Sequence, residues 1–183
     1  MTHQRDVDIC ENAETQLRLP AMNPTPQRLE MRRLAEVTEL LPTLVAWFER
    51  EWEPYYGVDG PGDAELDLRA SMNRDNLPIC LIAFAESGEP LGTISLKAES
   101  ISHPQLSPWG AAFVVSPSWR RRGVGGALVA FLEEEARRLG FGKLYMSTDG
   151  ATSIVERRGW QAFDTMESLR GTLGVYSIDL RDA

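Results

Sequence analysis

The most constraining feature of this sequence is one run, Phe113 to Leu128, in which an apolar segment leads through a proline and three arginines into a glycine-rich stretch. The apolar residues before Pro117 are typical of a buried strand that ends at a proline. From Val124 to Leu139 apolar residues recur at three- and four-residue steps, which predicts an amphipathic helix. Gly140 follows where helices commonly end. A strand that leads directly into such a helix predicts an α/β fold.

Shorter patterns on both sides of this run predict the remaining elements. Segments that alternate or are continuously apolar predict strands, and segments with one apolar helical face predict helices. The predicted strands span 27–34, 79–85, 91–98, 109–115, 143–147, 161–166 and 175–180, and the other predicted helices span 38–52, 64–72 and 153–158. This order predicts a single domain over 27–183 with a mixed sheet. Residues 1–26 contain interrupting prolines and little periodicity, so we expect a flexible tail.

Composition limits the function classes open to this domain. The chain has 183 residues, of which 43% are hydrophobic and 25% charged, as in an ordinary globular protein. Its net charge of −8 argues against a nucleic-acid partner, because such binders normally carry a basic excess. No apolar run is long enough to cross a membrane and no secretory signal is present, so we expect a cytoplasmic protein. Two separate cysteines, Cys10 and Cys80, predict neither a disulfide framework nor a metal site.

The start of the predicted helix has the chemistry of an anion-binding site. The first turn of a helix presents unpaired N–H groups and the positive end of its dipole. Gly123, Gly125 and Gly126 allow a ligand to approach the backbone closely. The arginines at 120–122 repel one another and oppose the dipole, a local conflict that favours a bound anion. The spacing fits neither a P-loop nor a dinucleotide fingerprint, which needs a glycine where Leu128 stands.

The pattern Arg120-x-x-Gly123-x-Gly125, after a strand and a proline, resembles the acetyl-CoA-binding signature of the GNAT family of N-acetyltransferases. The resemblance covers residues 27–180 and implies a mixed, mostly antiparallel central sheet flanked by helices and splayed between its fourth and fifth strands. It also implies a pyrophosphate held by backbone amides and a pantetheine arm lying along the strand at 113–115. The implied cofactor-binding residues are Phe113, Val114, Val115, Arg120, Arg121, Arg122, Gly123, Val124, Gly125, Gly126, Ala127 and Thr148.

The function that this resemblance implies is acetyl transfer from acetyl-CoA to a primary amine of a small molecule or a peptide. The amine would attack the thioester directly in a ternary complex, with no metal ion. A backbone N–H near Val114 is the expected donor to the oxyanion. Glu99 and His103, in the loop before the central strand, are candidate general bases.

The short late helix departs from the family pattern. It has Val155 where family members usually carry the tyrosine that protonates the departing thiolate, and Thr148 stands where they usually carry asparagine. Three explanations stay open. The thiolate leaves unaided, which a thiol pKa of ~8.5 allows; Tyr145 or Tyr176 supplies the hydroxyl; or the chain binds acyl-CoA without catalysis, as an interaction module.

Aromatic and acidic residues indicate the kind of acceptor. Four aromatic residues gather at the end of the first predicted helix, namely Trp47, Trp52, Tyr55 and Tyr56. Acidic residues follow at Asp59, Asp63, Glu65 and Asp67. Aromatic rings and negative charge both favour a cationic amine. We expect no nucleic-acid or membrane partner and leave a homodimer open.

Overall fold

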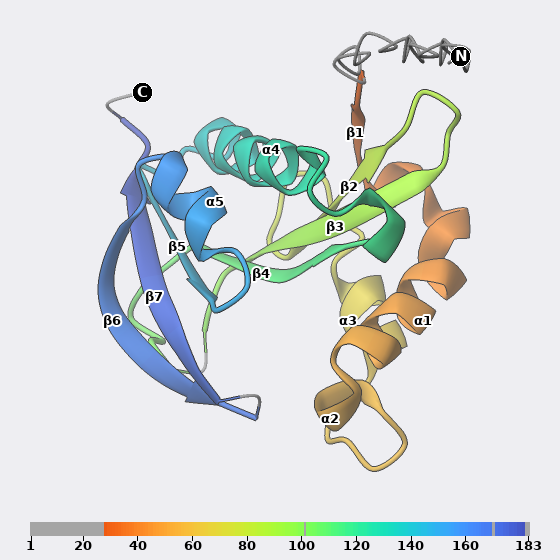
Figure 1. Ribbon diagram of the computed structural model, residues 1–183, viewed down its shortest axis with the longest axis horizontal. Coiled ribbons are helices and arrows are strands. Elements are labelled where there is room, and N and C mark those ends of the chain that lie inside the picture. The colour runs from red at the N-terminus through yellow and green to blue at the C-terminus, as the bar shows by residue number, and fades with distance from the viewer. Residues whose placement is uncertain (1–27, 101, 170, 182–183) are drawn as a thin grey trace, which may run out of the picture.

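The computed structural model of the chain describes residues 28–100, 102–169 and 171–181. The predicted tail, 1–26, lies outside these ranges. The described residues form a seven-stranded sheet with helices on both faces (Figure 1). Its strands are β1 (Glu30–Arg33), β2 (Ile79–Phe84), β3 (Pro90–Lys97), β4 (Trp109–Val115), β5 (Lys143–Thr148), β6 (Gln161–Ser168) and β7 (Gly171–Asp179). The helices are α1 (Leu41–Glu51), α2 (Glu53–Tyr56), α3 (Ala64–Ala70), α4 (Val124–Arg138) and α5 (Thr152–Arg157), with short 3-10 turns at Leu34–Glu36, Thr38–Leu40 and Pro117–Trp119.

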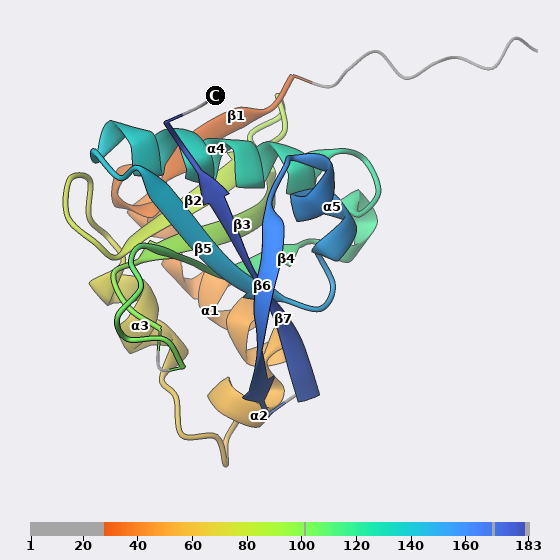
Figure 2. The ribbon, with the colours of Figure 1, turned by 90° about the vertical axis from the view of Figure 1, so that its left-hand side faces the viewer.

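The sheet is mixed and mostly antiparallel, with the strand order β1-β2-β3-β4-β5-β7-β6. Among the described strands only β4 and β5 run parallel, and they pair at two positions, Trp109 with Tyr145 and Gly110 with Met146. Beyond Gly110 the two strands separate, while β5 stays paired with β7 along its length (Figure 2). The predicted splay between the fourth and fifth strands is therefore confirmed.

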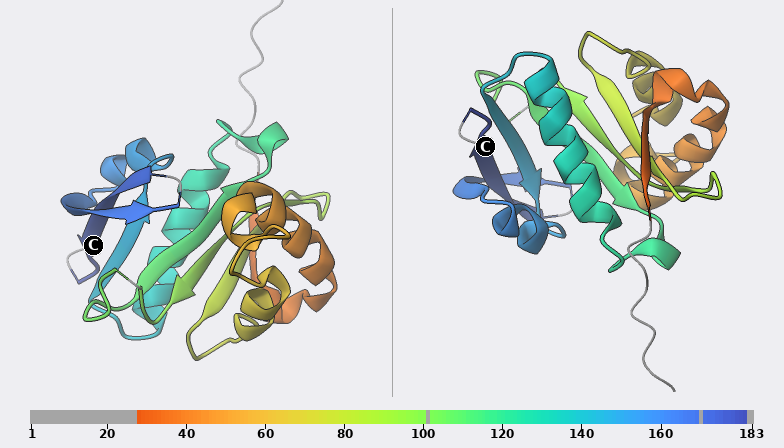
Figure 3. Two further views of the ribbon diagram at one scale, coloured as in Figure 1. Left: turned by 90° about the horizontal axis from the view of Figure 1, so that it is seen from below. Right: turned by 90° about the horizontal axis from the view of Figure 1, so that it is seen from above.

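Helices cover the two faces of the sheet as separate layers. α1 and α3 lie on one face of the β1–β4 half, with α2 beyond the end of α1. α4 lies on the other face, with α5 beside it next to β5 and β7 (Figures 1 and 3). Strand β2 is buried on both faces because successive strand side chains point in opposite directions. Its residues Ile79, Leu81 and Ala83 join the core under α4, and Cys80, Ile82 and Phe84 join the core under α1 and α3. The apolar run at 79–85 thus forms the doubly buried strand that its composition predicts.

The predicted helix over 38–52 differs most from the structure. It begins as a 3-10 turn, continues as α1 to Glu51, and is followed after Trp52 by the separate short helix α2. Pro54 lies in the first turn of α2. Proline fits there because a first-turn residue has no intrahelical acceptor for its N–H. The break at Trp52 places α2 opposite the tip of the β6–β7 hairpin (Figure 2).

Candidate active site

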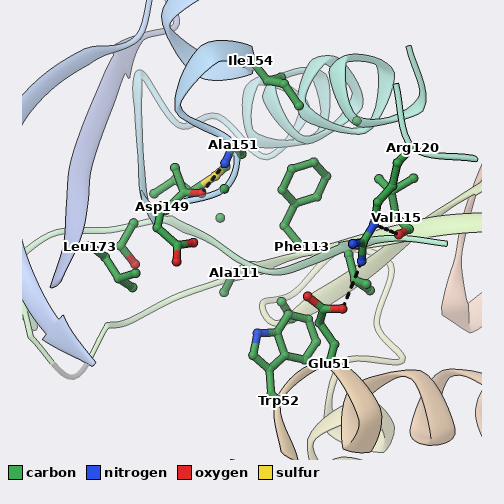
Figure 4. A pocket seen from close by; sticks show the side chains of 18 of the residues that line it. Glu51, Trp52, Ala111, Phe113, Val115, Arg120, Asp149, Ala151, Ile154 and Leu173 are labelled. Carbon is green, nitrogen blue, oxygen red and sulfur yellow. Dashed lines mark hydrogen bonds and ion pairs between the residues drawn. The ribbon is translucent and has the colours of Figure 1, made fainter. Parts of the chain in front are cut away.

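A cavity of about 970 Å³ opens where β4 and β5 separate. Its lining comes from β4, the start of α4, the β5–α5 turn, the α1–α2 junction and the β6–β7 hairpin. Figure 4 shows Phe113 near its centre, with Ile154 on the α5 side and Trp52 on the α1 side. A concave site of this size, shared by several elements, is typical of small-molecule binding.

A β-bulge in β4 shapes one wall of this cavity. Between the pairs Ala111–Ser95 and Val114–Thr93, β4 has two residues where β3 has one. Ala112, within the bulge, has φ +50°, which residues other than glycine rarely adopt. A bulge bends its strand, and here the bend accompanies the separation of β4 from β5. Residues 110–115 of this stretch line the cavity, and they include Val114, near which the oxyanion donor is predicted.

The first turn of α4 begins without a side-chain cap. Gly123 is the N-cap residue, with φ +86°, and no described side chain accepts a hydrogen bond from the amides that follow. The N–H groups of Val124, Gly125 and Gly126 are left for a ligand or water. A Cβ atom at Gly126 would meet nothing within 4 Å, whereas one at Gly125 would lie 2.9 Å from Ile154 Cδ1. Gly126 is therefore open to a ligand, and Gly125 is required by packing.

The three arginines of the motif have different surroundings. Arg120 donates to the carbonyl oxygen of Val115 at 2.9 Å and to a Glu51 carboxylate oxygen at 3.1 Å, which ties β4 to α1. Arg121 lines the cavity, has φ +62° and makes no hydrogen bond or ion pair with a described residue. Arg122 lies over an indole ring of the preceding 3-10 turn, 5.1 Å from its centre, and does not line the cavity.

Two charged residues of the cavity carry no signal of their own in the sequence. Arg157 of α5 and Asp149 of the β5–α5 turn both line it, and neither side chain bonds to a described residue. Figure 4 shows the Asp149 carboxylate directed into the cavity. The neighbouring Thr148, a predicted cofactor-binding residue, also lines it and accepts a hydrogen bond from the Ala151 N–H at 2.9 Å. Asp149 could have been found from its place directly after β5, whereas Arg157, the last residue of α5, has no such signal.

Most cofactor-binding residues that the resemblance implies are brought together by the structure. Phe113, Val114, Val115, Arg120, Arg121, Gly123, Gly125, Gly126 and Thr148 line the cavity. Arg122, Val124 and Ala127 do not. The Val124 side chain is buried in the core, and the Ala127 N–H is taken by the Gly123 carbonyl at 3.1 Å. Of Val124 and Ala127, Val124 alone keeps a main-chain N–H that is available to a ligand.

Glu99, His103 and Tyr145, the acid and base candidates, lie outside the cavity lining. His103 Nε2 is 3.1 Å from a carboxylate oxygen of Asp164, and this hydrogen bond lowers the pKa of Asp164. The rings of His103 and Tyr145 each lie 5.7 Å from Trp109. Glu99 is exposed in the loop that follows β3. Their catalytic roles stay predictions, without support from the geometry of the cavity.

The positions of the tyrosines bear on the missing acid. Val155, at the position of the usual tyrosine, is fully buried in the core under α4. Of the four tyrosines in the chain, only Tyr55 lines the cavity. Tyr176 is buried, and its hydroxyl lies 3.4 Å from the Thr152 hydroxyl at the start of α5. Neither Tyr145 nor Tyr176 therefore has its hydroxyl in the lining.

The aromatic cluster at the α1–α2 junction divides between the cavity wall and the core. Trp52 and Tyr55 line the cavity. Tyr56 donates to an Asp67 carboxylate oxygen at 2.7 Å, and burial together with this hydrogen bond raises the pKa of Tyr56. Trp47 packs against the core under α1 and α3. Asp67 and the other predicted acidic residues lie outside the lining.

The described part of the chain lacks two other kinds of site. It contains no group of three or more His, Cys, Asp or Glu side chains arranged to hold a metal ion. None of its helices is both long enough and apolar enough to cross a membrane. Cys80 is fully buried, and burial raises the pKa of its thiol to about 11, so it is no nucleophile.

Comparisons with known proteins agree with this fold. The structure is similar to an aminoglycoside 6'-N-acetyltransferase complexed with coenzyme A (TM-score 0.67, 14% identity, 84% of this chain and 98% of that chain). It is also similar to a GCN5-related N-acetyltransferase from Kribbella flavida (TM-score 0.65, 19% identity, 82% of this chain and 97% of that chain). A third neighbour is an acetyltransferase from Salmonella typhimurium with its cofactor acetyl-CoA (TM-score 0.59, 19% identity, 85% of this chain and 95% of that chain). At identities below 20%, this structural similarity shows a shared fold and no more. No curated protein matches the chain in sequence. The model of the acetyltransferase (GNAT) family matches residues 43–160, and the chain therefore belongs to that family.

Proposed function

We propose that this protein transfers the acetyl group of acetyl-CoA to a primary amine. The observation that carries the proposal is continuity: the uncapped start of α4 opens into the same cavity that separates β4 from β5. An anion site and a strand-lined channel are thereby joined. Membership of the acetyltransferase family and neighbours solved with coenzyme A or acetyl-CoA support it.

The residues of the cavity fit coenzyme A. The first-turn amides of α4, with open space at Gly126, suit the pyrophosphate. Arg121 and Arg157 bring two guanidinium groups with no described partner, which suit phosphate oxygens. Phe113 and Ile154 give apolar contacts for the arm that carries the thioester.

The proposed reaction is a direct attack of the neutral amine on the thioester carbonyl carbon. The C–N bond forms, the nitrogen loses a proton, and the C–S bond breaks to release the thiolate of coenzyme A. A β4 peptide N–H near Val114 donates a hydrogen bond to the developing oxyanion. Unaided departure suits this cavity, because a thiol pKa of ~8.5 makes the thiolate a fair leaving group and neither predicted replacement tyrosine lines it.

A second candidate function is a non-catalytic acyl-CoA-binding module on the same fold. The observation that favours it is Val155, whose burial in the core leaves no acid at the usual position. Both functions share the cofactor site and differ only in whether an amine is acetylated.

Amine-dependent release of free thiol from acetyl-CoA, with mass detection of the acetylated amine, separates these functions. Calorimetry of acetyl-CoA binding is measured beside it. Binding with amine-dependent release supports the acetyltransferase. Binding without release over a broad amine panel supports the module, and absence of binding contradicts both.

A further inference from the structure

The half of the cavity away from α4 has two apolar walls. Trp52, Pro54 and Tyr55 form one wall at the α1–α2 junction, and Leu169 and Leu173 of the β6–β7 hairpin form the other. Figure 4 shows Trp52 and Leu173 on different sides of the cavity. Tyr55 is 37% exposed and Leu169 68% exposed, so both walls present apolar surface at the mouth. Apolar surface exposed inside a concave site indicates a ligand with an apolar part.

The carboxylates that line this half differ in their partners. Glu51 forms an ion pair with Arg120 at 3.1 Å, so its charge is balanced. The Asp149 carboxylate points into the cavity and bonds to no described residue (Figure 4). The Asp149 backbone is held separately, because its carbonyl accepts a hydrogen bond from the Thr152 hydroxyl at 3.4 Å. A fixed turn thus presents one unbalanced negative charge between two apolar walls.

We infer that Asp149 binds the acceptor amine and that this acceptor is a small monoamine on an apolar body. The inference rests on the proposed function and specifies its substrate class. A polycation would bring several ammonium groups into a site whose described lining offers one unbalanced carboxylate, and the others would lose water without gaining partners. An apolar body instead fills the space between the walls and is favoured by its removal from water.

Asp149 then has a defined part in the transfer. Its carboxylate first binds the acceptor as the ammonium ion, which releases one proton to water. The carboxylate then accepts a hydrogen bond from an N–H of the neutral amine and orients the nitrogen toward the thioester carbonyl. As the C–N bond forms and the C–S bond breaks, the proton lost by nitrogen passes to this carboxylate and from there to water. The electron pair of the C–S bond leaves with the thiolate.

Matched variants test the role of Asp149. For Asp149→Asn we expect kcat/KM for the amine to fall about 10- to 100-fold, the range for loss of a charge-assisted hydrogen bond, with an unchanged Kd for acetyl-CoA. Asp59→Asn is the control, because Asp59 is an exposed carboxylate of the loop after α2 that does not line the cavity. Asp149→Glu should recover part of the activity. Equal kcat/KM values for the two asparagine variants would overturn the role.

An acceptor panel tests the substrate class. Ethylamine, 2-phenylethylamine, spermidine, kanamycin and a lysine peptide are compared by kcat/KM at one ionic strength. We expect 2-phenylethylamine to exceed ethylamine at least about tenfold, as burial of a ring predicts, and to exceed both polycations. Trp52→Ala and Leu173→Ala should each reduce that preference. The inference is overturned if a polycation or the peptide has a higher kcat/KM than 2-phenylethylamine. It is also overturned if the protein binds acetyl-CoA but acetylates no monoamine. Failure to bind acetyl-CoA would instead overturn the proposed function.

Discussion

Gly125 and Gly126 are neighbours in the first turn of α4, yet a side chain would meet different surroundings at each. A Cβ atom at Gly125 would lie 2.9 Å from Ile154 and 3.1 Å from Phe113, both of which line the cavity. At Gly126 it would meet nothing within 4 Å. A substitution at Gly125 therefore changes packing and ligand binding together, while one at Gly126 changes mainly the ligand site.

Gly126→Glu should remove acetyl-CoA binding and leave the protein folded. An acidic side chain in the first turn suits the helix dipole, and the open space accommodates it, but its charge would repel a pyrophosphate. Gly126→Gln is the uncharged control of equal size, and we expect it to bind at least about tenfold more tightly, equivalent to ~1.4 kcal/mol. Calorimetry gives the affinities and thermal unfolding checks the fold. Equal affinities of the two variants would show that no anion is bound here.

Arg121 and Arg122 form a second matched pair. Arg121 lines the cavity, whereas Arg122 packs over an indole ring outside it. Arg121→Ala should weaken acetyl-CoA binding about 10- to 100-fold, as expected for a charged hydrogen bond, and should flatten the dependence of affinity on salt. Arg122→Ala should change the affinity less than about threefold, or ~0.7 kcal/mol. A larger loss for Arg122→Ala would place the phosphates on the other side of the motif.

Helix α4 is attached to its neighbours by two buried glutamates, and for one of them, Glu133, the spacing of charges suggests an exposed position. Glu133 and Arg137 are spaced for an i,i+4 pair, but both Glu133 and Glu135 are almost fully buried. Glu133 accepts hydrogen bonds from Arg158 at 2.8 and 2.6 Å. Glu135 accepts from Arg33 of β1 at 2.9 and 2.8 Å. Partners from distant elements thus override the local pattern, which sequence spacing alone does not reveal.

The stability supplied by Glu135 should depend on pH. Burial alone would raise its pKa, but hydrogen bonds from Arg33 and Arg138 outweigh burial and lower the pKa. A carboxyl group with a lowered folded-state pKa stabilises the fold above its unfolded pKa, ~4.3, and the contribution is lost as pH falls through the folded value. Glu135→Gln should therefore lose about 2 kcal/mol near pH 7, given that its partners are partly exposed. Urea unfolding from pH 7 to pH 2 measures the difference, which should shrink in acid; a constant difference would contradict the ion-pair account.

The packing of α5 against α4 should prevent simple restoration of the usual acid. Val155 is fully buried, so a ring there overfills the core at a cost of about 1–3 kcal/mol. We expect Val155→Tyr and Val155→Phe to lower the unfolding temperature similarly and to release thiol at equal rates per folded molecule. A Tyr variant faster than its Phe control would mean that the phenol reaches the sulfur.

For the molecule as a whole, the sequence predicts those features that are formed by residues close to one another along the chain. The order of strands and helices follows from periodicity, and the proposed anion site follows from contiguous residues of one strand–turn–helix run. The other walls come from segments that the strand order β4-β5-β7 brings together, so Asp149 and Leu173 have no signal of their own. The bulge at Ala112 could not be predicted from the sequence either, because alanine is not a residue type that indicates a left-handed backbone.

The account as a whole requires both substrates in one cavity, with the acetyl group passing directly between them. Initial rates over a grid of acetyl-CoA and amine concentrations test this most directly, combined with the intact mass of the protein during turnover. We predict intersecting double-reciprocal lines and no acetylated protein, as a ternary complex requires. Parallel lines together with an acetylated protein species would show a covalent intermediate and contradict direct transfer in the cleft between β4 and β5.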